Sequence, residues 1–183
     1  FRIPPAYWPR ALFMTLSSVG NSFALKRERE EYGQAIDAAS VPAPVFILGH
    51  WRSGTTHLHN LLTIDRQFCY PNFYQVTHPY TFLTTEEKAS QSKALQALAP
   101  ATRLIDNMQA SLSAPMEDEV ALAMMTGMSP VMAFVFPENR DHFDRYLAFR
   151  DFSAEEKRQW QSAFLTYLKK LTIRYQRPIV LKS

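Results

Sequence analysis

The pattern of apolar and polar residues changes several times along the chain, and each change predicts an element. The unbroken apolar run from Val45 to Leu48 is typical of a strand that is buried on both faces of a parallel sheet. A helix is expected from Thr55 to Ile64, where leucines recur at helical spacing. The loop between them contains Gly49 and Gly54. The pattern therefore predicts a strand, a glycine-bounded loop and a helix in succession.

A second strand is predicted near the end of the printed sequence. Ser153 to Glu156 forms a capping box, and after it aromatic residues and leucines recur at steps of three and four. The resulting long amphipathic helix precedes the apolar stretch Pro178 to Leu181. Because parallel strands need a crossover connection, the helix is expected to carry the chain to a second parallel strand. The predicted fold class is α/β.

The first 43 residues form a separate helical segment ahead of this predicted domain, which spans residues 44–183. Trp8 to Leu25 is mostly apolar, but Arg10, Gly20 and Asn21 interrupt it, so a transmembrane helix is not expected. We predict an amphipathic helix that packs on the rest of the protein. The alternative is an interfacial membrane helix with Trp8 and Arg10 at the boundary. Lys26 to Ala39 is predicted to be a charged surface helix.

Aromatic residues and prolines are dense between Pro71 and Phe82. This composition favours an ordered loop at the carboxyl edge of the sheet, where α/β proteins bind ligands. Two interpretations stay open at this point. The aromatic residues fill space in a packed connection, or they line an acceptor pocket in which His78 is a candidate base.

Three acidic residues, Glu117, Asp118 and Glu119, follow Pro115, which suits the first position of a helix that ends at Gly127. Acids in a first turn complement the helix dipole, and this alone is a sufficient explanation. The functional interpretation is that one carboxylate faces a reaction site and takes a proton. Because successive helical residues are about 100° apart, at most one or two of the three can face one site.

Composition narrows the classes of function. The 183 residues are 46% hydrophobic and 20% charged, as in an ordinary globular domain with a sizeable core. A net charge of +3, with dispersed basic residues, argues against a nucleic-acid partner. The single cysteine, Cys69, excludes an internal disulfide and a cysteine-rich metal site. A reducing compartment is compatible with this, so we predict a cytoplasmic protein, with peripheral membrane association through residues 1–43 as an extension.

The stretch from Gly49 to Thr56 has the frame of an anion-binding loop. A strand, a glycine loop and a helix point backbone N–H groups and the positive end of the helix at one spot. In a nucleotide triphosphatase a lysine follows the second glycine, whereas here Thr55 stands at that position and the cation is Arg52, inside the loop. Phosphate or a similar tetrahedral anion is therefore expected. The alternative is an ordinary turn with helix-capping threonines.

Arg52-Ser53-Gly54-Thr55-Thr56 resembles the 5′-phosphosulfate loop of the sulfotransferases, and Phe46 to Thr56 is most similar to a mainly bacterial branch of that superfamily. The resemblance implies a P-loop NTPase-like three-layer fold with a central parallel sheet, helix-rich in this region. It also implies the co-substrate 3′-phosphoadenosine 5′-phosphosulfate (PAPS), with no metal. The donor-binding residues are then expected to be Arg52, Ser53, Gly54, Thr55 and Thr56, with His57 beside them.

Two later stretches also resemble sulfotransferases. In the cytosolic members a strand ends in Lys-Thr-His, where the lysine contacts the sulfonate or bridging oxygen and the histidine is the base. Lys182-Ser183 resembles the start of that site, and Pro115 to Glu119 resembles a recurrent feature of the bacterial branch. The candidate catalytic residues are therefore Arg52, Lys182, Glu117, Glu119 and His78.

The expected function is transfer of a sulfuryl group from PAPS to a hydroxyl or amine of a partly apolar small-molecule or lipid acceptor. A P-loop kinase or other nucleotide-binding enzyme is the first alternative. A non-catalytic anion-binding module is the second, if the 183 residues are the whole protein. The superfamily's 3′-phosphate motif follows the lysine strand and is not in this sequence, so we expect the chain to be the amino-terminal part of a longer protein.

Overall fold

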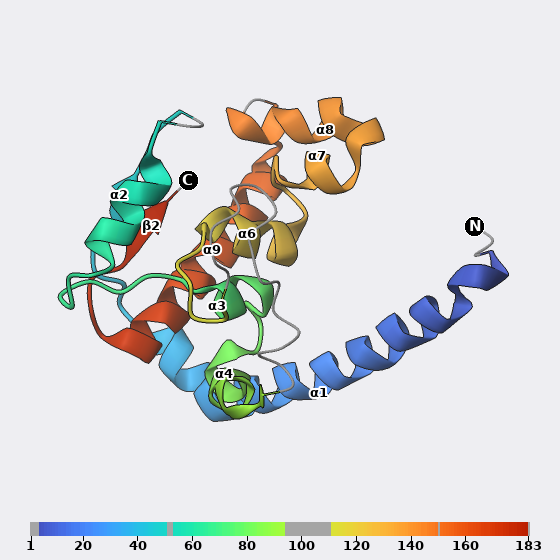
Figure 1. Ribbon diagram of the computed structural model, residues 1–183, viewed down its shortest axis with the longest axis horizontal. Helices are drawn as coiled ribbons and strands as arrows, with labels where there is room; N and C mark the ends of the chain where they lie inside the picture. Colours follow the sequence, from blue (N-terminus) through green and yellow to red (C-terminus); the bar gives the residue numbers. More distant parts are fainter. Residues whose placement is uncertain (1–3, 51–52, 94–110, 150, 183) are drawn as a thin grey trace.

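The computed structural model describes residues 4–50, 53–93, 111–149 and 151–182, and its fold is helix-rich with a small parallel sheet (Figure 1). In chain order the elements are η1 (Pro5–Tyr7), α1 (Trp8–Ala38), β1 (Val45–Ile47), α2 (Thr55–Leu62), α3 (Phe73–Thr77), α4 (Phe82–Gln91), α6 (Asp118–Thr126), α7 (Met132–Val135), η2 (Pro137–Asn139), α8 (Arg140–Asp144), η3 (Arg145–Leu147), α9 (Ala154–Tyr175) and β2 (Val180–Lys182). The combination of helices with a parallel sheet agrees with the α/β class.

The strands β1 and β2 pair in parallel, with Val45 opposite Val180 and Ile47 opposite Lys182. Cys69 forms a single parallel bridge with Ile179, the residue before β2. The three residues of β2 are buried, whereas Val45 and Phe46 of β1 are 40% and 46% exposed. The prediction that the first strand is buried on both faces is therefore wrong, because only Ile47 of its three side chains is covered by the described residues.

The crossover helix α9 begins where the sequence predicts. The Ser153 hydroxyl accepts a hydrogen bond from the Glu156 N–H at 3.1 Å, and the Glu156 carboxylate accepts one from the Ser153 N–H at 2.9 Å. This capping box satisfies two backbone donors that the first turn would otherwise leave without partners. Farther along, Tyr167 and Leu171 are fully buried in the core, so the helix holds β2 against the rest of the fold.

The stretch from Pro71 to Phe82 is not the loop that its composition predicts. It contains α3, whose start is a capping box between Asn72 and Gln75, and it ends where α4 begins. Aromatic and aliphatic side chains along it, such as Tyr74 and Val76, are buried in the core. The burial favours a packed connection over an acceptor pocket.

The predicted helix at Pro115 begins three residues later, at Asp118. Pro115 forms an antiparallel bridge with Asn72, and the Met116 N–H donates to the Pro71 carbonyl at 2.9 Å. This extended pairing competes with helix formation and delays it to the residue after Glu117. The predicted end is confirmed, since Gly127 has a φ of 67° in the left-handed region that glycine adopts readily.

The segment before β1 is one continuous helix, α1. Its second half packs against α4 and α9, where Glu28, Gly33 and Ile36 are buried. Its first half projects away from the rest of the molecule (Figure 1), and its apolar side chains are exposed. The prediction that the apolar half packs on the domain is therefore wrong. The charged half lies at the surface as predicted, with most of its residues exposed, and it docks through the three buried ones.

A buried ion pair joins α1 to α9. The Lys170 Nζ lies 2.5 Å from the Glu28 carboxylate, and the two side chains are 4% and 3% exposed. The ammonium also donates to the Pro79 carbonyl at 2.5 Å, and the Glu28 carboxylate accepts from the Thr84 N–H at 3.2 Å. Burial lowers the pKa of Lys170, while the carboxylate of Glu28 opposes that shift. The pair fixes three helices relative to one another.

Candidate functional site

The loop between β1 and α2 closes tightly on the first turn of the helix. Gly54 has a φ of 92°, a conformation that strains residues with a side chain. A Cβ atom at Gly49 would lie 2.5 Å from the Thr55 Cγ2 atom and 3.0 Å from the Ser53 hydroxyl. Both glycines are therefore needed, one for its backbone conformation and the other for the close approach of the helix.

The first turn of α2 presents backbone donors toward this loop. The first intrahelical bond is donated by the Leu58 N–H to the Gly54 carbonyl at 3.0 Å. The N–H groups of Thr55, Thr56 and His57 therefore precede the intrahelical ladder, and Gly54 has no side chain with which to cap them. Such a turn suits an anion, and its two threonine hydroxyls add further donors. Arg52, the predicted cation of the loop, lies outside the described residues.

Lys182 and Glu117 form an ion pair at the carboxyl end of β2. The Lys182 side chain is 8% exposed and that of Glu117 is 32% exposed, so the pair reaches solvent on the carboxylate side. Lys182 lies opposite Ile47 in the sheet. Ile47 is the last residue of β1, and the loop that contains Gly49 follows it. Glu117 is the N-cap residue of α6, but its side chain does not cap the helix. The fold thus brings together two candidate residues that are 65 positions apart.

The other two acids have different surroundings, as their positions around the helix axis require. Asp118 is buried at 2% exposure, close enough to Tyr167 to act on that hydroxyl electrostatically. Glu119 is partly buried beside Ser129. Burial raises the pKa of Glu119, the hydrogen bond with the Ser129 side chain opposes this, and the charge of Glu117 adds to the rise. Ser129 carries no sequence signal that would have indicated this contact.

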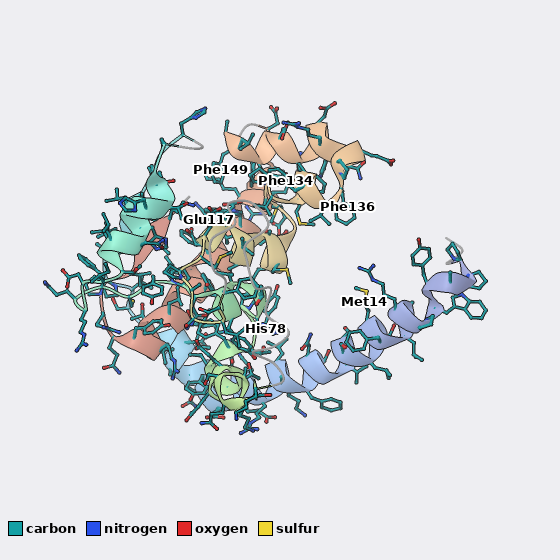
Figure 2. All side chains as sticks on the ribbon, viewed as in Figure 1. Met14, His78, Glu117, Phe134, Phe136 and Phe149 are labelled. Carbon is teal, nitrogen blue, oxygen red and sulfur yellow. The ribbon has the colours of Figure 1, made fainter. Side chains whose placement is uncertain are left out.

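His78 is not brought together with Lys182 and Glu117. Figure 2 shows it near α3 and α4, apart from Glu117. Its ring stacks on Tyr74 with centroids 4.3 Å apart, and its Nδ1 atom lies 3.3 Å from the Tyr74 carbonyl. His78 is exposed as a residue, and burial lowers the pKa of its ring while the contact with the Tyr74 carbonyl opposes this. Its role as a base stays a prediction.

A row of aromatic rings extends from β1 toward α8, and sequence reasoning did not find it. The Phe46 ring lies 6.5 Å from Phe164, which lies 5.2 Å from Trp160, and Phe149 lies 5.0 Å from Trp160. Phe149 is 54% exposed, and Phe134 and Phe136, on and directly after α7, are 73% and 47% exposed; all three are labelled in Figure 2. These aromatic residues are visible in the sequence, but they are scattered over several elements and belong to no single motif, so the sequence does not indicate that they meet.

An open cavity of about 660 Å³ lies between α1, α6 and α9. Its lining includes Tyr80, Met125 and the buried Lys170, and it includes none of the predicted site residues. The cavity is therefore separate from the loop that follows β1. Among the described residues no group of three or more histidine, cysteine or acidic side chains is placed to hold a metal ion. None of the described helices is long and apolar enough to cross a membrane.

Cys69 is not a candidate nucleophile. Its side chain is 1% exposed, and burial raises the pKa of its thiol to about 11. The thiolate is the reactive form of cysteine, so this thiol is inert at neutral pH. The residue instead fills the core beside β2.

Comparisons with known proteins identify the family of the chain. The family described as "Sulfotransferase family" matches residues 44–171, which is more than half of the chain. The omega-hydroxy-beta-dihydromenaquinone-9 sulfotransferases Stf3 of Mycobacterium bovis and Mycobacterium tuberculosis are each 29% identical over 184 residues. The match covers 100% of this chain and 47% of each relative, so the chain spans about half their length. No solved structure matches it. By the extent of the family match, the chain belongs to the sulfotransferase family.

Proposed function

We propose that the protein transfers the sulfuryl group of PAPS to a hydroxyl group of a partly apolar small-molecule or lipid acceptor. The observation that carries this proposal is the position of the Lys182–Glu117 pair. It places a cation and a carboxylate at the carboxyl end of β2, next to the strand that leads into the glycine loop. A transfer reaction between a phosphosulfate and a hydroxyl needs a cation and a proton acceptor beside an anion-binding loop.

On the donor side, the N–H groups at the start of α2 would hold the 5′-phosphate, with the hydroxyls of Thr55 and Thr56 as further donors. The close approach of Gly49 to Thr55 and the left-handed Gly54 fit this role, because they leave the backbone accessible to an anion. Arg52 and the neighbouring Ser53 and His57 would complete the phosphate contacts. The proposal includes the family's three-layer arrangement around a parallel sheet, of which β1 and β2 are two strands.

The reaction forms a bond between the acceptor oxygen and sulfur, and it breaks the bond between sulfur and the bridging oxygen of the donor. The SO₃ unit moves, the hydroxyl proton goes to a base, and 3′-phosphoadenosine 5′-phosphate (PAP) leaves. Negative charge develops on the bridging oxygen. The ammonium of Lys182, with Arg52, would neutralise that charge, and no metal is needed for this role.

Glu117 is the base that the geometry supports best. Its carboxylate pairs with Lys182 and is partly open to solvent, so an acceptor hydroxyl can reach it. Glu119 is the second candidate, since burial and the charge of Glu117 raise its pKa and make it a better proton acceptor. His78 remains the third, although it would need an acceptor that extends to α3.

The acceptor class rests on two observations. The mycobacterial relatives are named for a menaquinone-derived acceptor. In this chain, the aromatic row that begins at Phe46, the residue before Ile47, offers an apolar surface that leads away from the proposed reaction site. Aromatic and hydrophobic side chains are the usual lining of sites for apolar ligands. We therefore propose an acceptor with an apolar body and one reactive hydroxyl.

Calorimetric titration of the complete protein with PAP tests the donor assignment, with ATP and magnesium as the comparison. Saturable binding of PAP, with much weaker binding of ATP, is the expected result. A preference for ATP would overturn the proposal in favour of a kinase or another nucleotide-binding enzyme. Binding of neither nucleotide would favour a non-catalytic module.

Replacing Gly49 with alanine should weaken PAP binding about tenfold. The new Cβ would lie 2.5 Å from the Thr55 methyl, so the helix must shift away or the Thr55 side chain must rotate, at a cost of about 1–3 kcal/mol. Titration of the complete protein measures the change. Thr55→Ser removes the clashing methyl, so the double variant G49A/T55S should recover part of the lost affinity. No recovery, with T55S itself near wild type, would contradict the proposed cause.

A further inference from the structure

The first half of α1 carries a stripe of exposed apolar side chains. These are Trp8, Leu12, Leu16, Val19 and Phe23, here called the α1 stripe, and they are between 51% and 70% exposed. They follow one another at steps of four, four, three and four residues. At about 100° per residue, this spacing places all five on one face of the helix.

The α1 stripe points away from the body of the protein. The second half of the same helix docks through Glu28, Gly33 and Ile36. By the same angular step, the mean direction of these three residues is about 130° from that of the α1 stripe. Figure 1 shows the first half of α1 extending beyond the other helices, and Met14, labelled in Figure 2, stands on this projecting part. The surface by which α1 packs on α4 and α9 therefore differs from the α1 stripe.

The chain up to residue 27 carries a net positive charge. Residues 1–27 contain four basic side chains and no acidic one, whereas the remaining residues contain sixteen basic and seventeen acidic side chains. The positive excess of the whole chain thus lies in and beside the projecting half of α1. The side of the helix opposite the α1 stripe carries the polar residues Arg10, Ser17 and Asn21, together with the exposed Met14. Lys26 and Arg27 face Glu30 and Glu31 at 3.9 Å and 3.8 Å, but these pairs are exposed and hold the basic side chains only weakly. An apolar face, a more polar face and an excess of basic residues at one end are features of helices that lie on anionic membranes.

We propose that the first half of α1 is an interfacial helix that docks the protein on an anionic lipid bilayer. The α1 stripe would lie at the boundary between headgroups and acyl chains, and Trp8 would be at the level that indole rings favour. The helix lies along the surface, since it is not long and apolar enough to cross the bilayer. This docking goes beyond sulfuryl transfer and holds whatever the acceptor is. For a lipid acceptor, it would bring the site to the surface where the acceptor resides.

Co-sedimentation of the complete protein with vesicles tests the proposal. Vesicles of phosphatidylcholine with 30% phosphatidylglycerol should bind the protein, and pure phosphatidylcholine vesicles should bind it less. Leu16→Glu, in the centre of the α1 stripe, should lower the partition coefficient about tenfold or more, because it places a charge where the proposed docking would bury a leucine in the bilayer. Asn21→Glu adds the same charge on the opposite face and should lower it by about threefold at most. Both positions are exposed, so neither change should unfold the protein.

Three results would overturn the proposal. The first is no binding to either kind of vesicle. The second is an equal loss in L16E and N21E, which would mean that charge alone governs binding. The third is a concentration-dependent dimer, seen by analytical ultracentrifugation, that L16E abolishes while vesicles bind nothing; this would assign the α1 stripe to a second copy of the chain. PAP titration of L16E separates this test from the proposed function, because donor binding should be unchanged.

Discussion

Replacing Lys182 with methionine in the complete protein should lower the turnover number for sulfuryl transfer about a thousandfold. The physical reason is that the ammonium would neutralise charge that develops on the bridging oxygen, and removal of one such group typically costs a factor of about 10²–10³. Affinity for PAP, measured by titration, should change much less, because the loop N–H groups hold the 5′-phosphate. Steady-state kinetics with a PAPS donor and an apolar alcohol acceptor would measure the turnover.

The stability of this variant should be nearly normal. Glu117, which loses its partner, is 32% exposed and can be solvated by water, and methionine fills a volume close to that of the lysine stem. Lys157→Met is the matched control, since Lys157 is an exposed lysine on α9 and should be dispensable for transfer. Turnover within about threefold of wild type in K182M, with normal folding, would remove Lys182 from the mechanism.

The Glu117→Gln variant distinguishes a base from a residue that only holds Lys182. If the carboxylate takes the proton, E117Q loses turnover and the acidic limb of the pH–rate profile together. A residue that only positions the lysine would lower turnover and leave the limb in place. The structure favours the first result, because the Glu117 carboxylate is the more exposed member of the pair.

The sequence predicts those parts of the molecule that depend on local signals. The capping box at Ser153 begins α9, and the left-handed Gly127 ends α6. Both act through contacts within a few residues, and both occur as predicted. The glycine loop is local in the same sense. The meeting of Lys182 and Glu117 depends on how β2 and α6 pack, yet each was selected from its own neighbourhood, as a strand end and as an acidic helix start.

The predictions that failed are those in which distant residues compete with a local signal. Pro115 suits a helix start, but it pairs with Asn72, and the Met116 N–H donates to the Pro71 carbonyl, so this stretch stays extended beside residues 43 or more positions earlier in the chain. Periodicity assigned the apolar half of α1 to the core and the charged half to the surface. In the structure the apolar half is exposed, and the charged half, although mostly exposed as predicted, docks through a few residues because Glu28 finds an ionic partner on α9 that no pattern within α1 indicates.

Loss of the buried ion pair between Lys170 and Glu28 is expected to have the second large effect, on the stability of the fold. Lys170→Met should lower the free energy of unfolding by about 3–5 kcal/mol, because it leaves the Glu28 carboxylate buried without its cation. Glu28→Gln should destabilise by a similar amount for the converse reason. The double variant K170M/E28Q should be more stable than either single variant, since neither charge remains to be desolvated. Urea denaturation of the four proteins at pH 7 gives the coupling free energy.

The pH dependence of E28Q identifies the cause of its instability. Burial lowers the pKa of Lys170, and loss of the Glu28 carboxylate, which opposes this shift, should lower it further. Between that lowered pKa and the unfolded value of about 10.4, the unfolded chain binds more protons than the folded one. The free energy of unfolding of E28Q should therefore rise with pH across this window, whereas below it the full penalty of burying the ammonium remains. In K170M the titrating ammonium is absent, so this rise should disappear. A profile of E28Q parallel to that of K170M would mean that lost packing, and not an unpaired charge, destabilises the variant.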